Sequence, residues 1–282
     1  MKTIHTLNEL RQILADERAH GKKIGLVPTM GNLHAGHIAL VQQAKENADI
    51  IVSTIFVNPL QFSAGEDLDK YPRTLQADQE KLEAVGCHYL FVPSEEEVYP
   101  DGREKQTMVE VPDVSDLYCG ASRPGHFQGV ATIVCKLFGM VQPDLAIFGA
   151  KDYQQLFVIR KMTKDLSLPI SIQGSPIVRN EHGLALSSRN GYLSEEELSA
   201  ATALNKTLKV TAQAIEEGNT DFDTLVETAQ LQLEDAGFKR DYFVIARQSD
   251  LLAASQGDTQ LVILAAAYMG AARLLDNQVI NL

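Results

Sequence analysis

The stretch IGLVPTMGNLHAGH, residues 24–37, decides the fold class of this chain. Residues 24–28 form a short apolar strand-like run, and the apolar spacing of residues 37–48 predicts a helix. The glycine-bearing segment between them is a strand-to-helix turn, where doubly wound sheets bind ligands beyond the carboxyl ends of their strands. Such a turn is expected to present backbone N–H groups to phosphate, so the stretch predicts a nucleotide site.

The flanking sequence repeats the same alternation of strand and helix. Residues 7–20 have a helical stripe, which Gly21 ends. Short continuous apolar runs at 50–57, 89–93 and 145–148 predict further strands, and helical spacing recurs at 74–85 and 130–141. Continuous apolar strands are typical of burial on both faces, which favours a parallel sheet with right-handed crossovers. We therefore expect a doubly wound, Rossmann-like nucleotide-binding domain over residues 1–179.

The last third of the chain has a different pattern. Helical spacing at 195–217 and 224–236 precedes strand-like runs at 242–246 and 261–267. Helices followed by strands in blocks predict a smaller α+β domain, here residues 180–282, which we expect to close over the site. The segment 174–189 is rich in turn-forming residues and is the expected hinge region.

Composition and charge exclude several classes of protein. The net charge of −12 and a pI near 5.0 oppose binding of nucleic acid. The N-terminus lacks the apolar run of a signal peptide, and the longest nearly apolar run, 261–272, is too short to cross a bilayer. Three widely spaced cysteines without a C-x-x-C pattern fit a reducing compartment. We expect a cytoplasmic protein without a membrane partner.

The turn after the first apolar strand carries a distinctive pair of histidines. Gly31 and Gly36 have the spacing of a Walker A loop, but His37 stands where its lysine belongs, and no G-x-G-x-x-G follows. The motif that remains is H-x-G-H, in which His34 and His37 share a helix face and Gly36 permits close approach of a ligand. Imidazoles so placed can donate hydrogen bonds to a reacting phosphate, which favours nucleotidyl or phosphoryl transfer. A metal pair is the alternative, although zinc would need a further ligand that nothing nearby clearly supplies.

These residues resemble the pantothenate synthetase family, within the H-x-G-H nucleotidylyltransferase superfamily. The matching segments follow in family order: PTMGNLH at 28–34, FVNPLQF at 56–62, YPRT at 71–74, RPGHF at 123–127, FGAKDYQQ at 148–155 and LSSRN at 186–190. The resemblance covers roughly residues 24–192 in motifs. Ala150 departs from the family, which usually has Glu there, and we expect little consequence.

The resemblance implies condensation of (R)-pantoate with β-alanine through a pantoyl-adenylate, releasing AMP and pyrophosphate. ATP would enter with Mg²⁺, and a homodimer is expected. The implied catalytic residues are His34, His37, Lys151, Ser187, Ser188 and Arg189. The implied ATP-binding residues are Met30, Gly31, Asn32, Leu33, His34, Ala35, Gly36, His37, Gly149, Ala150, Lys151, Asp152, Val178, Leu186, Ser187, Ser188 and Arg189.

The chemistry of individual side chains agrees with those roles. Lys151 follows a core strand and could neutralise phosphates, and the hydroxyl and guanidinium groups of residues 187–189 suit a departing pyrophosphate. The amides of Asn58, Gln61 and Gln155 suit a hydroxy acid, because an amide donates and accepts hydrogen bonds at once.

Three polar residues keep two interpretations each. Asp152 could cap the following helix or contact nucleotide. Asp78 could bind Mg²⁺ directly or through water, but a helix-surface aspartate is the commoner case, and no metal ligand is assigned. His126 could take part in the site or serve packing, and packing is the preferred interpretation.

Other functions remain as alternatives. An adenylyltransferase acting on a phosphorylated acceptor would favour basic residues around the acceptor, whereas amides are found. A tRNA-charging enzyme is opposed by the short acidic chain. A nucleotide sensor would bind ATP without turnover, and an assay of pyrophosphate release separates it from an enzyme.

Overall fold

The computed structural model describes residues 1–63 and 65–282. The chain folds into two compact units, and each is described by itself. The first unit comprises Met1–Ala150 and Gln155–Pro176, and the second comprises Lys151–Gln154 and Ile177–Leu282. Along the chain, the last boundary between the two units falls after Pro176, and residues 151–154 group with the second unit. The expected division after residue 179 stays a prediction.

Two sheets are formed within the described part of the chain, one six-stranded and one three-stranded. The larger belongs to the first unit, and its neighbouring strands all pair in parallel. Its order is β1 (Lys2–Ile4), β4 (Tyr89–Phe91), β3 (Ile50–Ile55), β2 (Ile24–Thr29), β5 (Leu145–Gly149) and β6 (Ser171–Ser175). The central strands β2, β3 and β5 are buried except at their carboxyl ends, as their continuous apolar sequences predict.

The strand order reverses beside β2. The chain runs outward from β2 through β3 to β4, and then returns to build β5 and β6 on the other side of β2. The carboxyl ends of β2 and β5 therefore border a topological switch point, the usual ligand crevice of such sheets. The segment that follows β2 is the H-x-G-H turn, so the fold itself places the motif at this crevice.

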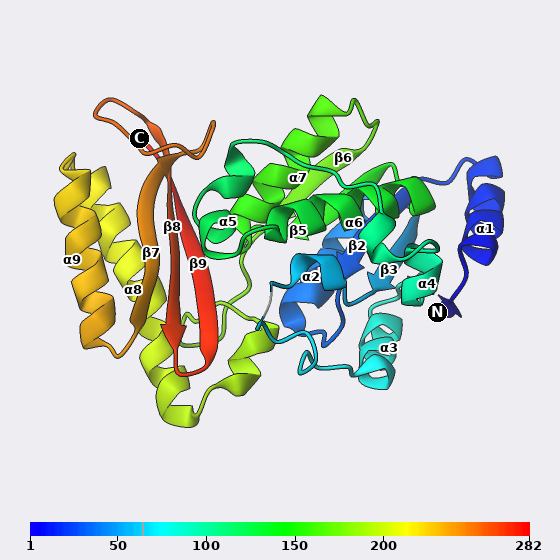
Figure 1. Cartoon of the computed structure of the whole chain (residues 1–282), viewed down its shortest axis with the longest axis horizontal. Helices are drawn as coiled ribbons and strands as arrows, with labels where there is room; N and C mark the ends of the chain where they lie inside the picture. The colour runs from blue at the N-terminus through cyan, green and yellow to red at the C-terminus, as the bar shows by residue number, and fades with distance from the viewer. Residues whose placement is uncertain (64) are drawn as a thin grey trace. The chain divides into compact units, whose positions relative to one another are not determined.

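Helices cover both faces of the parallel sheet (Figure 1). They are α1 (Leu7–Ala19), α2 (Ala35–Asn47), α3 (Leu75–Ala84), α6 (His126–Val141) and α7 (Tyr153–Asp165). Because the crossovers are right-handed, α2 and α3 lie on one face and α1 and α6 on the other, and the helices of each pair contact one another. Shorter turns complete the unit: η1 (Pro59–Gln61), α4 (Glu95–Val98), η2 (Arg103–Lys105), η3 (Val114–Asp116) and α5 (Cys119–Ser122).

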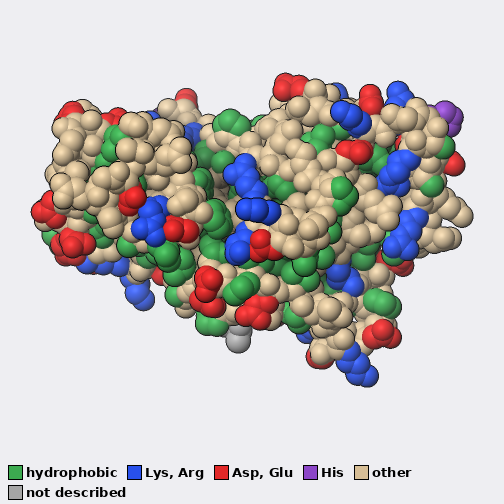
Figure 2. All heavy atoms as spheres, turned by 90° about the horizontal axis from the view of Figure 1, so that it is seen from above, with side chains coloured by type: hydrophobic (Ala, Val, Ile, Leu, Met, Phe, Trp, Pro, Cys, Tyr) green, Lys and Arg blue, Asp and Glu red, His purple; other side chains and the backbone are tan. Residues whose placement is uncertain are grey.

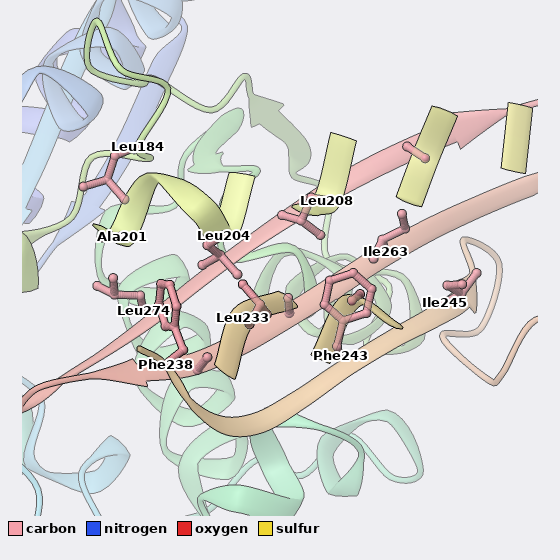
Figure 3. Close-up of a cluster of buried hydrophobic side chains, with 14 of the residues drawn as sticks. Leu184, Ala201, Leu204, Leu208, Leu233, Phe238, Phe243, Ile245, Ile263 and Leu274 are labelled. Atoms are coloured by element: carbon pink, nitrogen blue, oxygen red, sulfur yellow. The ribbon is translucent and has the colours of Figure 1, made fainter. Parts of the chain in front are cut away.

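The second unit is an α+β layer with its own core. Its antiparallel strands are β7 (Lys239–Arg247), β8 (Gln260–Met269) and β9 (Ala272–Asn281), and α8 (Glu195–Glu216) and α9 (Phe222–Asp235) cover one face. Figure 3 shows the core between these layers, with Leu204 and Leu208 of α8 near Phe243 and Ile263 of the sheet. Leu184, from the segment before α8, belongs to the same core.

The predicted fold class is confirmed, with differences at particular elements. Strands β1, β6 and β9 were not expected: β1 has three residues, β6 is polar and partly exposed, and β9 contains Asp276 and Asn277, which disfavour strands. Helix α6 begins at His126 rather than at residue 130. The expected hinge region contains the end of β6 and a hairpin that is bridged between Arg179 and Ala185.

Figure 2 shows acidic and basic side chains interspersed on the face that it displays. A helical membrane span was sought over the described residues, and none of their helices has the length and apolar character to provide one.

Candidate active site

The turn between β2 and α2 begins with two residues in the left-handed region, Gly31 at φ +83° and Asn32 at φ +51°. Glycine adopts this conformation without strain, and asparagine tolerates it better than most residues do. The Thr29 hydroxyl donates to the carbonyl of Thr54 at 2.6 Å and accepts from Gly31 N at 3.2 Å. The end of β2 thereby fixes where the turn starts.

Asp78 of α3 holds the middle of this turn. Its side chain is buried, and its carboxylate accepts hydrogen bonds from the backbone N–H groups of Asn32 and Leu33, each at 2.8 Å. Thr74 adds its hydroxyl at 3.1 Å. One helical turn further along, Lys81 donates to the Leu33 carbonyl at 2.7 Å. The prediction that Asp78 lies on the surface of its helix is therefore wrong, because α3 packs this side chain against the turn.

The two histidines of the motif are oriented by the backbone of their own turn. His34 is the N-cap of α2, and its Nδ1 accepts from Gly36 N at 3.1 Å, while His37 Nδ1 accepts from His34 N at 3.3 Å. The ring centroids lie 4.1 Å apart. In a neutral imidazole whose Nδ1 accepts, the proton is on Nε2, so both rings carry a donor at Nε2.

Gly36 has a steric role that differs from the one expected. A Cβ at this position would lie 2.8 Å from Cε1 and 2.9 Å from Nδ1 of His34. The glycine therefore makes room for the His34 ring against the helix backbone, whatever ligand binds there.

The expectation that the turn presents its N–H groups to phosphate is wrong for most of the turn. The donors of Gly31, Asn32, Leu33, His34 and Gly36 all bond within the protein. The physical reason is that the Thr29 hydroxyl, the Asp78 carboxylate and the two imidazoles already supply acceptors. The imidazole Nε2–H groups are of a kind that can donate to an anion, and the N-terminal end of the α2 dipole favours one.

Asn58 and Gln61 lie beyond the end of β3, at η1. Asn58 is buried, with 1% of its surface exposed. Its Oδ1 accepts from Leu60 N at 3.4 Å and from the Tyr99 hydroxyl at 2.7 Å, and its Nδ2 donates to Gln61 Oε1 and to the Gly129 carbonyl, each at 3.1 Å. Asn58 therefore orients Gln61.

The orientation of Gln61 follows from that arrangement. Because Gln61 Oε1 accepts from Asn58, its Nε2 is the end that donates, and Nε2 lies 3.3 Å from Met30 Sδ. This contact joins the amide group expected at the acid to the turn expected at the nucleotide. Burial, and then the charge of Glu95, raise the pKa of Tyr99, so the hydroxyl that fixes Asn58 stays protonated.

A charged cluster holds the backbone of Gln61. Its carbonyl receives His126 Nδ1 at 2.8 Å and Arg123 Nη2 at 3.3 Å, and Arg123 pairs with both carboxylate oxygens of Glu66 at 2.6 and 2.7 Å. Burial alone would raise the pKa of Glu66, but the hydrogen bond and charge of Arg123 outweigh it and lower the pKa. His126 is largely buried against Phe127, so its expected packing role is confirmed.

The first unit also contains three further predicted site residues. Gly149 ends β5, and Ala150 continues its ladder by donating to the Ser175 carbonyl at 2.8 Å. Gln155 lies in the first turn of α7 and is partly exposed.

In the second unit, Lys151 and Asp152 lie directly after that segment. Lys151 Nζ is 3.5 Å from Asp152 Oδ2, and its side chain is 17% exposed. The Lys151 carbonyl accepts from Asn277 Nδ2 of β9 at 2.8 Å. Both readings of Asp152 stay open, and its pairing with Lys151 is compatible with either.

The remaining predicted residues lie on or after a hairpin of the second unit. Val178 and Leu186 pair through their backbones at 2.9 Å, so any contact they make with a base would extend from a formed hairpin. Ser187 then caps η4 (Ser188–Tyr192) by accepting from Arg189 N at 3.3 Å. The hydroxyl of Ser187 therefore has a local structural partner, which the sequence did not indicate.

Sequence reasoning missed the residues that position the others. Asp78 was noticed but placed on a surface, because helical spacing alone does not tell which face a neighbouring loop covers. Tyr99, Glu66 and Asn277 carry no local signal, since their partners are distant in sequence. Among the described residues no group of three or more His, Cys, Asp or Glu side chains is arranged to hold a metal ion.

A doubly wound sheet with paired imidazoles at its switch point defines a class of α/β enzyme that acts on nucleotides. Comparison with known proteins narrows this class. The model of the pantoate-beta-alanine ligase family matches residues 2–279. The chain therefore belongs to the pantoate-beta-alanine ligase family and is a ligase of that type.

Individual relatives agree over the whole chain. It is 60% identical to the pantothenate synthetase of Pseudomonas entomophila over 282 residues, covering 100% of this chain and 98% of the relative. The solved pantothenate synthetase of Thermus thermophilus has a TM-score of 0.92 at 43% identity, with 99% of each chain covered. The pantoate-beta-alanine ligase of Francisella tularensis, solved with beta-gamma ATP and beta-alanine, has a TM-score of 0.81 at 32% identity, covering 99% of this chain and 97% of that one.

Proposed function

We propose that this chain condenses (R)-pantoate with β-alanine at the expense of ATP, through a pantoyl-adenylate, to give pantothenate, AMP and pyrophosphate. Family membership supports the overall reaction. The observation that supports attack of the acid on the α-phosphate is the contact of Gln61 Nε2 with Met30 Sδ at 3.3 Å. It sets a hydrogen-bonding group suited to the acid beside the turn suited to the α-phosphate.

In the first step, the pantoate carboxylate attacks the α-phosphorus in line, and pyrophosphate leaves. A carboxylate is already a nucleophile, so this step needs no base. The Nε2–H groups of His34 and His37 donate to the charge that develops on the α-phosphate. Their Nδ1 atoms accept backbone N–H groups, which keeps the rings in place before ATP binds.

In the same step, Lys151, Ser187, Ser188 and Arg189 bind the phosphates that depart. A compact ammonium, hydroxyl donors and a guanidinium suit a polyphosphate chain. Backbone groups of Gly149 and Ala150, with Asp152, Val178 and Leu186, contribute further contacts to ATP. In the second step the β-alanine amine attacks the acyl carbon, and AMP leaves.

Pantoate binds through the amides of Gln61 and Gln155. Gln61 donates from Nε2, because its Oε1 is engaged by Asn58. Asn58 acts through Gln61 as a positioning residue. Its burial supports this change from the direct contact that was expected.

Mg²⁺ enters as part of the ATP complex. Asp78, the candidate protein ligand, uses its carboxylate on two backbone N–H groups and a hydroxyl, so it does not fit a resident metal site in this conformation. A homodimer, a cytoplasmic location and the division of labour between residues 1–179 and 180–282 stay predictions.

Isotope exchange tests the proposal. With enzyme, Mg²⁺ and pantoate but no β-alanine, labelled pyrophosphate should exchange into ATP, because adenylate formation is reversible. Exchange that requires β-alanine would contradict the two-step order. Exchange with other small acids but never with pantoate would contradict the substrate, and ATP binding without any turnover would identify a sensor.

A further inference from the structure

Two consecutive polar residues interrupt the apolar strand β9 of the second unit. Asp276 and Asn277 are 4% and 5% exposed, although neighbouring strand residues such as Leu274 and Ile280 belong to the hydrophobic core. Successive residues of a strand point to opposite faces of its sheet. The pair therefore reaches two different parts of the unit from one point on the strand.

Asp276 points to the face covered by α8 and anchors the hairpin that precedes η4. It forms a two-pronged ion pair with Arg179, at 2.5 and 2.9 Å, and Arg179 also donates to the Gly183 carbonyl at 3.1 Å. Asn205 of α8 lies against the pair, and its amide oxygen can accept from Arg179 at 2.9 and 3.2 Å. The hairpin is thus tied to β9 at its first bridged residue.

The hairpin in turn holds the loop that contains Ser187, Ser188 and Arg189. Leu186 N donates to the Val178 carbonyl at 2.9 Å, and Asn190 Nδ2 donates back to the Ala185 carbonyl at 3.0 Å. A displacement of Arg179 would therefore be passed on to Arg189 through a short, hydrogen-bonded path.

Asn277 points to the opposite face and fixes the other phosphate-directed segment. Its Nδ2 donates to the Lys151 carbonyl at 2.8 Å. Residues 151–154 group with the second unit although β5 and the rest of α7 belong to the first. The contact with Asn277 is a physical reason for that grouping.

We propose that Asp276 and Asn277 are positioning residues that hold Lys151 and the loop at 187–189 in one fixed arrangement, so that they bind the departing pyrophosphate together. The inference rests on the proposed function of those residues. A buried ion pair adds little net stability compared with apolar packing of the same volume. What Asp276 and Arg179 provide is a defined geometry, and a polyphosphate needs several donors at set separations.

The test for Asn277 uses Asn277→Leu, which removes the donor at similar volume. Asn281→Leu makes the same change at an exposed position of the same strand and is the matched control. Asn277→Leu should slow pyrophosphate exchange by about 10- to 100-fold, the range expected when a reacting group is displaced slightly. The KM for pantoate should stay within about twofold of the wild-type value, because that substrate is assigned to other residues.

A double mutant shows whether Asn277 acts through Lys151. In the Lys151→Ala background, Asn277→Leu should lower the exchange rate little further, because the lysine side chain that Asn277 positions is already absent. Three results would overturn the proposal. The fold-reductions in exchange rate caused by the two substitutions could multiply in the double mutant, or Asn277→Leu could slow exchange no more than Asn281→Leu does. The third is a rise in the KM for pantoate as large as the fall in exchange rate. Asn277→Ser, which is smaller and cannot reach the Lys151 carbonyl, provides the same measurement if the leucine variant does not fold.

Asp276 is tested in the same way against the loop. Asp276→Asn should slow pyrophosphate exchange in the wild-type background. In the Arg189→Ala background it should cause little further reduction in the exchange rate. Additive losses would overturn its positioning role. If Lys151→Ala and Arg189→Ala themselves leave exchange unchanged, the proposed function of the two segments fails instead, which distinguishes the two failures.

Discussion

The buried carboxylate of Asp78 accepts the backbone N–H of Leu33 at 2.8 Å, across 45 residues of sequence. The same carboxylate accepts the N–H of Asn32. A side chain of α3 therefore fixes the turn that carries both histidines, and it occupies donors that a phosphate would otherwise attract.

Replacing Asp78 with Asn should damage both stability and catalysis. The amide would turn its NH₂ group toward a backbone donor, and leaving such a buried donor unsatisfied costs about 1–3 kcal/mol. Chemical denaturation and the rate of pyrophosphate exchange measure the two effects. Asp165→Asn, at an exposed ion pair of α7, is the control and should change neither. If the Asp78→Asn variant exchanges pyrophosphate at the wild-type rate, the turn keeps its shape without the carboxylate.

His37→Ala should lower kcat by roughly 10²-fold or more, the scale for losing one preorganised donor to a developing charge. The KM for ATP should change far less, because the donation is strongest in the transition state. Steady-state kinetics check this, with the exposed His20→Ala as a control. A near-normal kcat would show that His37 has a structural role and not a catalytic one.

Gly36→Ala should separate stability from activity. Alanine favours a helix by about 1 kcal/mol relative to glycine, but the new Cβ would lie 2.8 Å from the His34 ring and displace it. Thermal unfolding should change little while kcat falls by at least about tenfold. Gly139→Ala in α6, where the structure places nothing within 4 Å of the new Cβ, should keep full activity. Equal kcat values in the two variants would refute the steric role.

Tyr99→Phe should raise the KM for pantoate by several-fold and leave the KM for ATP nearly unchanged. It removes the hydroxyl that holds Asn58 at 2.7 Å, and Asn58 orients Gln61. Tyr89→Phe also removes a hydroxyl with a hydrogen bond, to Glu17, and serves as the matched control. If the two variants affect pantoate alike, the relay from Tyr99 to Gln61 is not functional.

The ion pair of Glu66 and Arg123 should make stability depend on pH in the acid range. The folded-state pKa of Glu66 lies below its ordinary value of 4.5, so its contribution is present above that value and is lost as pH falls through the folded-state pKa. The difference in unfolding free energy between wild type and Glu66→Gln should be constant from about pH 6 to about pH 5 and shrink below that. Denaturant titrations measure it. Glu104→Gln, which removes a largely exposed carboxylate, should show no such trend.

The sequence by itself determined the α/β class, the place of the H-x-G-H turn after a buried strand, and the choice of His34 and His37. These conclusions follow from local rules: apolar periodicity sets each element, and parallel strands present their carboxyl ends at one edge of the sheet. Lys151 was proposed because it follows a core strand, and Gln61 was proposed from its place in the family resemblance; the roles of both stay predictions.

Tertiary structure decided which groups support those residues. Asp78 and Leu33 are 45 residues apart, and Asn277 and Lys151 are 126 apart, so no local pattern connects either pair. The sequence pattern did not predict strand β9, because its central Asp276 and Asn277 are poor strand formers. Their burial depends on partners from distant segments. Buried polar groups are stable only where folding brings a partner within hydrogen-bonding distance, and that distance is a property of the packed chain.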